Sequence, residues 1–175
     1  MDNLNVKIEY SQQQLKRIGL HLVSLIRDRT AKGKDKDGLP FKEYSQRPFT
    51  IPYANATKAA IKQLVKEKKA MIFTDANNVK KAIIFNGYLD YKKLVYKDTS
   101  YDGTVNLIMT GRMLANFGVI NVSGNKIVLG FNDTQMAERA KANIRLGRDF
   151  LGLSPEDKRD PHFQDLLASG FTLQI

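Results

Sequence analysis

The chain has 175 residues, 42% of them hydrophobic and 26% charged, which is typical of a soluble globular protein with one well-buried core. It contains no cysteine, and this excludes a disulfide framework, a thiolate zinc site and a cysteine nucleophile. The first residues lack the basic-then-apolar order of a signal peptide, and no apolar run has the length of a membrane span. We therefore expect a protein that stays in the compartment where it is made.

The net charge of +10 is concentrated in the first part of the chain. Residues 1–100 hold 20 Lys and Arg against 10 Asp and Glu, whereas residues 101–175 hold 8 of each kind. This asymmetry indicates either contact with a polyanion such as nucleic acid or a solvated surface that keeps the protein in solution.

The first predicted element is an amphipathic helix over residues 11–31. Its apolar residues recur at helical spacing, and they are Leu15, Ile18, Leu22, Leu25 and Ile26. Gly33 and the charged run 32–38 then predict a mobile, basic loop. Pro40 and Phe41 bring the chain back toward the body.

The middle of the chain predicts a second helix, over residues 55–69, after an irregular stretch at 44–54 that contains two prolines. One side of this helix carries a row of four lysines, Lys58, Lys62, Lys66 and Lys69. Like charges at this spacing destabilise an isolated helix, so the row needs either solvent or an anionic partner.

Two apolar runs, residues 71–73 and 82–85, predict short strands or buried turns. Tyr88, Tyr91 and Tyr96 alternate with lysines after them. Aromatic side chains among basic ones can stack on nucleotides, but tyrosines also suit half-buried positions of a sheet.

The second half predicts a strand at 106–109 that leads into a helix at 111–117, with Thr110 as its cap and Gly111 relaxing the junction. A β-hairpin follows at 119–122 and 126–131, then a helix at 134–143 and a short strand at 150–153. Ser154 and Pro155 predict a helix start, and Gly170 ends that helix. The last residues, 172–175, are a final strand or a free tail.

Together these elements predict an α+β fold, a small antiparallel sheet packed against an N-terminal long helix and further helices. The length favours a single domain over residues 1–175, with an insertion near 70–86.

Catalytic patterns are weak. His21 and His162 lack a partner pattern such as His-Glu-x-x-His, and the chain has no P-loop. Glu67 has the Glu-x-Lys spacing of some nucleases, but metal-dependent cutting would need a second carboxylate converging from a strand. We expect no enzyme, no cofactor and no metal site.

Three segments in order resemble the phage virion morphogenesis family, the Mu G protein-like tail-completion and neck proteins. The first is Ile-Arg-Asp-Arg-Thr at 26–30 followed by Asp-Gly-Leu-Pro-Phe at 37–41. The second is Val-Asn-Leu at 105–107 with Thr-Gly-Arg-Met-Leu at 110–114. The third is Arg148 and Asp149 followed by Phe-Leu-Gly-Leu-Ser at 150–154, after an Ala-rich helix.

The resemblance implies a structural virion protein of the head–tail junction, as a tail-completion, tail-terminator or neck ring that joins DNA-filled heads to tails. Its expected partners are further copies of itself in a homo-oligomeric ring, neighbouring connector, portal-side or tail-tube proteins, and packaged DNA in the channel. No membrane is expected. The expected location is the virion, assembled in the host bacterial cytoplasm.

Two surfaces follow from these expectations. Residues 32–38 and 143–148 are expected to be exposed docking segments, and the subunit or partner interface is assigned to Pro40, Phe41, Arg145, Arg148 and Phe150. The DNA-facing residues are assigned to Lys58, Lys62, Lys66, Lys69, Lys32, Lys34 and Lys36. The alternatives are a sequence-independent DNA-binding protein and a small metal-dependent nuclease.

Overall fold

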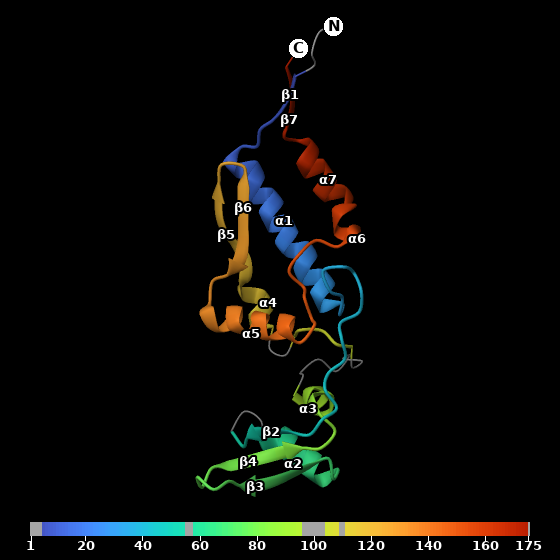
Figure 1. Ribbon diagram of the computed structural model, residues 1–175, viewed down its shortest axis with the longest axis vertical. Helices are drawn as coiled ribbons and strands as arrows, with labels where there is room; N and C mark the ends of the chain where they lie inside the picture. The colour runs from blue at the N-terminus through green and yellow to red at the C-terminus, as the bar shows by residue number, and fades with distance from the viewer. Residues whose placement is uncertain (1–4, 55–57, 96–103, 109–110, 175) are drawn as a thin grey trace. The chain divides into compact units, whose positions relative to one another are not determined.

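The computed structural model describes residues 5–54, 58–95, 104–108 and 111–174 (Figure 1). The chain forms two compact units. Unit 1 consists of Met1–Lys42 and Asn106–Ile175, and unit 2 is the intervening segment Glu43–Val105. The segment 70–86, expected as an insertion, lies inside unit 2.

Unit 1 is built around the long helix α1 (Gln12–Ala31), which has the β5–β6 hairpin on one flank and α7 on the other (Figure 1). Ser11 and Gln14 begin α1 with a reciprocal capping box. Gly19 lets the hairpin approach closely, because a Cβ there would lie 2.9 Å from Val119 Cγ2 and 3.0 Å from Ile127 Cγ2. The other elements of unit 1 are β1 (Asn5–Ile8), α4 (Arg112–Asn116), β5 (Phe117–Ser123), β6 (Lys126–Phe131), α5 (Thr134–Arg145), α6 (Pro155–Lys158), α7 (Pro161–Ala168) and β7 (Phe171–Gln174).

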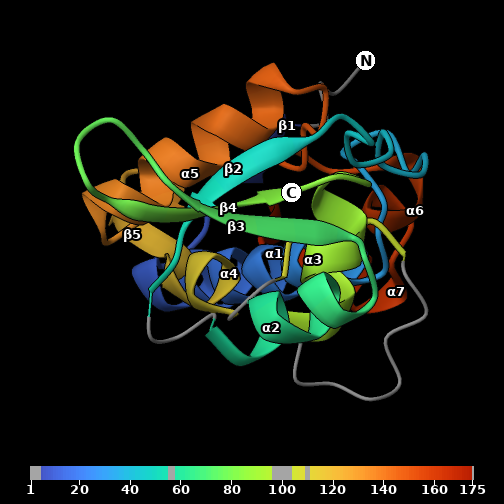
Figure 2. The ribbon, with the colours of Figure 1, turned by 90° about the horizontal axis from the view of Figure 1, so that it is seen from below.

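Unit 2 is a three-stranded antiparallel sheet with two helices on one face. Its strands lie in the order β2–β4–β3, and Figure 2 shows α2 and α3 together on one side of them. Leu64, Ala70 and Ile84 form the core between the sheet and the helices, with Tyr91 of α3 packed against it. The elements are β2 (Phe49–Pro52), α2 (Lys58–Lys66), β3 (Ala70–Thr74), β4 (Lys80–Ile84) and α3 (Tyr88–Val95).

The α+β class is confirmed, as are the long first helix, the β5–β6 hairpin, α5 and the helix start at Ser154. The single helix predicted from Ser154 to Gly170 is wrong, because α6 ends at Lys158 and Asp160 and Pro161 begin a separate helix, α7. The short apolar runs near 71 and 83 form strands, and the last residues pair as β7 with β1, from Asn5↔Gln174 to Ile8↔Phe171. The final strand is therefore no free tail.

Three predicted elements are wrong in the first part of the chain. Residues 44–54 are not wholly irregular, because β2 pairs with β4. β2 is an edge strand, where a proline is tolerated because its missing N–H would face away from the neighbouring strand. The second helix ends at Lys66, since Lys68 adopts a left-handed backbone with φ 59°. Tyr88 and Tyr91 lie on a helix rather than in a sheet, while Tyr96 lies outside the described residues.

Two predicted strands of the second half are also wrong. Residues 104–108 form no strand, and the Asn106 side chain instead accepts a hydrogen bond from the Ile108 N–H at 3.3 Å. Met109 and Thr110 lie outside the described residues, so the cap assigned to Thr110 does too. Gly111, with φ 73°, precedes α4 without a side-chain cap. Residues 150–153 form no strand, and the carbonyls of Phe150 and Gly152 instead accept hydrogen bonds from the Arg29 side chain.

Candidate functional site: the loop junction at Arg29

The end of α1 positions a buried guanidinium, that of Arg29, where two loops of unit 1 meet. Arg29 is only 5% exposed, and it lies in the last turn of the helix. Beside it, the buried Thr30 hydroxyl donates to the Ile26 carbonyl at 2.6 Å, which satisfies its polar group within the helix. A charge at this depth requires partners from the loops around it.

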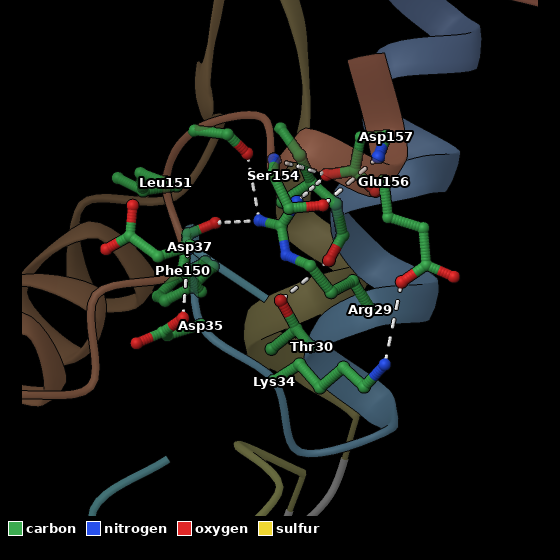
Figure 3. A network of polar contacts seen from close by, with 12 residues as sticks. Arg29, Thr30, Lys34, Asp35, Asp37, Phe150, Leu151, Ser154, Glu156 and Asp157 are labelled. Atoms are coloured by element: carbon green, nitrogen blue, oxygen red, sulfur yellow. Dashed lines mark hydrogen bonds and ion pairs between the residues drawn. The ribbon is translucent and has the colours of Figure 1, made fainter. Parts of the chain in front are cut away.

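The loop between α5 and α6, residues 146–154, and the start of α6 supply those partners (Figure 3). We call residues 146–154 the closing loop. Arg29 Nη2 donates to the carbonyl oxygens of Phe150 and Gly152, both at 2.8 Å, and Nη1 pairs with the Asp157 carboxylate. Ser154 and Asp157 form a capping box at the start of α6, in which the Ser154 N–H donates to Asp157 Oδ2 at 2.9 Å. The Asp157 carboxylate thus both caps the start of α6 and pairs with Arg29.

The front loop, residues 33–41, is folded on itself. The Lys34–Pro40 bridge closes it, and Asp35 Oδ1 accepts hydrogen bonds from the N–H groups of Asp37 and Leu39, both at 2.9 Å. Gly38, with φ 82°, makes the turn that these bonds require. The sequence predicts a mobile loop at 32–38, whereas the structure shows an ordered turn with its own hydrogen bonds.

The front and closing loops are joined directly. The Lys36 N–H donates to the Asp149 carbonyl at 2.8 Å, while Lys36 Nζ lies 3.0 Å from the Asp149 carboxylate. The hydrogen bond to Asp149 raises the pKa of Lys36, with the charges of Asp149 and Asp37 acting in the same direction. Lys34 Nζ lies 3.5 Å from Glu156 in a more exposed pair.

A hollow of about 670 Å³ opens beside the junction, between the end of α1, the front loop and the start of α6. Its lining mixes both signs of charge: Asp28, Lys32, Lys34, Glu156 and Arg159 contribute side chains to it. Burial lowers the pKa of Arg29, while the charges of Asp35 and Asp37 oppose that change. Among the described residues, no three His, Cys, Asp or Glu side chains gather in a group that could hold a metal ion.

The two histidines lie together, which their spacing in the sequence did not reveal. The rings of His21 on α1 and His162 on α7 meet edge to face, with centroids 4.6 Å apart. His21 Nε2 also lies 2.7 Å from Asp160 Oδ1, the atom that caps α7 by accepting the Phe163 N–H at 2.8 Å. The contact ties α7 to α1.

The residues assigned to an interface divide into two groups. Pro40 and Arg145 are exposed, but Phe41, Arg148 and Phe150 are at most 6% exposed. Arg148 Nε donates to the Lys42 carbonyl at 2.9 Å, so its guanidinium stabilises the inside of unit 1. The assignment is corrected for these three, and segment 143–148 is the end of α5 and its cap rather than a free arm.

The lysines assigned to DNA contact divide as well. Lys58, Lys62 and Lys66 are exposed on α2, and Lys32 is exposed after α1. Lys69 lies outside the helix, 3.0 Å from Glu67 and 4.0 Å from Asp90. Lys34 and Lys36 are occupied by carboxylates, as described above. Of the lysines assigned to DNA contact, those that remain open on unit 2 are the row of three on α2.

Among the described residues, no helix combines the length and the apolar character that crossing a bilayer would require. No family model, no curated protein and no solved structure matches the chain.

Proposed function

We propose that the chain is a structural phage virion protein of the head–tail junction, a tail-completion or neck protein that forms part of a ring. One observation carries the proposal: segments that resemble the family, although more than a hundred residues apart, converge on a single junction. Arg29 belongs to the first of them, and it binds the backbone of Phe150 and Gly152 in the last. The Cβ position of Gly38 lies 3.7 Å from Ser154 Cβ.

This convergence gives the motif residues a common physical role. A glycine at 38 permits the turn, an arginine at 29 satisfies the carbonyls of the closing loop, and a serine at 154 starts α6. A ring component needs loops of fixed shape because each copy must present the same surface to its neighbours. Arg29 supports that role by fixing two loops at once.

The proposal is tested by deleting the gene in the phage that encodes it. Deletion should leave DNA-filled heads and finished tails unattached, and the wild-type gene supplied from a plasmid should restore infectious particles. A second plasmid with an early stop codon is the matched control. Normal infectious particles from the deletion would refute the proposal.

The alternative is a sequence-independent DNA-binding protein, and the specific observation in its favour is the exposed row Lys58, Lys62 and Lys66 on α2. Replacing all three by Gln should lower the slope of log affinity against log salt by about 2 to 3, since each phosphate contact contributes about 0.9. Lys69→Gln is the control, because Lys69 is paired with Glu67. Equal salt slopes for the triple variant and the wild type would refute a role for the row.

A further inference from the structure

The helix-covered face of the unit 2 sheet continues past its apolar core into a polar corner. Phe49 and Ile51 of β2 pack against the core, and alternation places Tyr53, two residues later, on the same face. On β4 the same alternation places Lys80 in line with Ala82, which is fully buried. The Tyr53 N–H donates to the Lys80 carbonyl at 3.0 Å, so the two residues are neighbours across the strands.

The Tyr53 ring holds two ammonium groups at this corner. Lys80 Nζ lies 5.2 Å from the ring centroid, and the Nζ of Lys58, the first residue of α2, lies 5.8 Å from it. Both lysines are exposed, and the tyrosine is partly buried. We call Tyr53, Lys58 and Lys80 the basic corner.

The positive charge of the basic corner is uncompensated. Within the described part of the chain, neither of its lysines has a carboxylate partner, and α2 has no acidic residue in its first turn. Other lysines of unit 2 are paired, since Lys81 Nζ lies 2.6 Å from Asp75 and Lys69 Nζ lies 3.0 Å from Glu67. Two ammonium groups gathered on one ring repel each other, and an anion that contacts both removes the repulsion. The basic corner therefore fits an anionic ligand.

The positive charge also extends away from the basic corner. Lys62 and Lys66 follow Lys58 at four-residue steps along α2, about 6 Å apart along the helix axis, and both are exposed. The whole chain has a net charge of +10. A line of cations that starts at the corner matches a row of phosphates better than it matches a single small anion.

The aromatic ring distinguishes between the polyanions that could bind here. Unpaired bases stack on aromatic side chains while neighbouring lysines bind the phosphates, and this mode of binding tolerates any sequence. In a duplex the bases are stacked and paired inside, so only the phosphates are available to the corner. Cation–π contacts at exposed sites are weak, so the two ammonium groups can leave the ring for phosphates when a base takes their place.

We propose that the basic corner binds single-stranded nucleic acid, with one base on Tyr53 and the adjoining phosphates on Lys58 and Lys80. This activity goes beyond the head–tail role and does not depend on it. It also differs from duplex binding by the row on α2, because it needs the tyrosine ring. The sequence alone assigns Lys58 to DNA contact, whereas Tyr53 and Lys80 reach it only through the pairing of β2 with β4.

Tyr53 gives the sharpest test. Fluorescence anisotropy measures the affinity of the full-length chain for a labelled oligothymidine of about 12 nucleotides. Tyr53→Leu should weaken binding about ten-fold, because the stack of one base is lost, and Tyr53→Phe should bind as tightly as the wild type. A labelled hairpin duplex is the control for folding, since the wild type and Tyr53→Leu should bind it equally.

The two lysines are tested together by the salt dependence of the same binding. A chain with Lys58→Gln and Lys80→Gln should lower the slope of log affinity against log salt by about 1.4, since each phosphate contact on a single strand contributes about 0.7. Lys81→Gln is the matched control, because Lys81 is next to Lys80 in the chain but is paired with Asp75. Its slope should equal that of the wild type.

Three results would overturn the proposal. The first is equal affinity of Tyr53→Leu and the wild type for the oligothymidine, and the second is an equal salt slope for the double variant and Lys81→Gln. The third is binding of the wild type to phosphatidylserine vesicles without binding to the oligothymidine, which would assign the basic corner to a lipid surface. All three come from purified protein alone, so they are separable from the outcome of the gene deletion.

Discussion

Each of the two units of the chain is stabilised internally in its own way. Unit 1 fixes its loops with a buried charge, because Arg29 joins the end of α1 to the Phe150 and Gly152 carbonyls and to Asp157. Unit 2 has an apolar core of Leu64, Ala70 and Ile84 between its sheet and its helices (Figure 2). Polar anchoring defines one shape for the loops of unit 1, whereas unit 2 depends on the packing of apolar side chains.

The strongest test of this difference is Asp157→Asn, which leaves the Arg29 guanidinium buried without its carboxylate. We expect the free energy of unfolding of unit 1 to fall by about 3–5 kcal/mol, because removing one member of a buried pair strands the other. Hydrogen exchange followed by peptide mass should show faster exchange in α1 and α6 and unchanged exchange in unit 2.

Glu156→Gln is the matched control for that change. Glu156 is largely exposed and pairs with Lys34 at 3.5 Å, so its loss should cost less than about 1 kcal/mol. Equal effects of the two variants would mean that the Arg29–Asp157 pair does not anchor the junction.

The reciprocal test is Ile84→Ala in the core of unit 2. Ile84 is fully buried, and its truncation should lower the stability of unit 2 by about 2–5 kcal/mol while α1 keeps its protection from exchange. Ile83→Ala, on the opposite face of the sheet, should cost clearly less, because Ile83 is only partly buried. A loss of protection in both units from Ile84→Ala would show that they unfold as one.

A smaller effect is expected from Ser154→Ala at the start of α6. The change removes the side-chain acceptor of the Asp157 N–H, and such caps contribute about 0.5–2 kcal/mol. Ser123→Ala, at the exposed end of β5, is the control in the same unit. Chemical denaturation followed by circular dichroism would detect the difference, and indistinguishable midpoints would contradict a capping role.

The smallest predicted effect is a pH dependence at Asp160. The hydrogen bond with His21, and then that from the Phe163 N–H, hold the pKa of Asp160 below its usual value. A lowered pKa in the folded state means stability that is present above the unfolded value of about 3.9 and lost as the pH falls through the folded value. Asp160→Asn should therefore be less stable than wild type near neutrality, with the gap closing in acid. A gap that stays constant down to acid pH would contradict the contact.

Local sequence patterns predicted the helices and turns that are determined by neighbouring residues. The spacing of Leu15, Ile18 and Ile26 was enough for α1, and Ser154 with Pro155 was enough for the start of α6. The turn at Gly124 between two apolar runs was enough for the hairpin.

Other misses depend on partners far away in the chain. Residues 150–153 form no strand, and Arg29, over a hundred residues earlier, donates hydrogen bonds to the Phe150 and Gly152 carbonyls. The β1–β7 pairing joins the two ends of the chain, and His21 meets His162 only after α7 packs on α1. The candidate site could be predicted only in part. The sequence singles out its motif residues, but it does not predict that Phe41, Arg148 and Phe150 are buried.

We propose that the chain is a part of a phage particle at the point where head and tail join. Quantitative mass spectrometry of purified, DNA-filled, tailed particles from the phage that carries the gene is the decisive measurement. We expect the chain at a small, fixed number of copies per particle, as a ring requires. Complete infectious particles that lack the chain would contradict it.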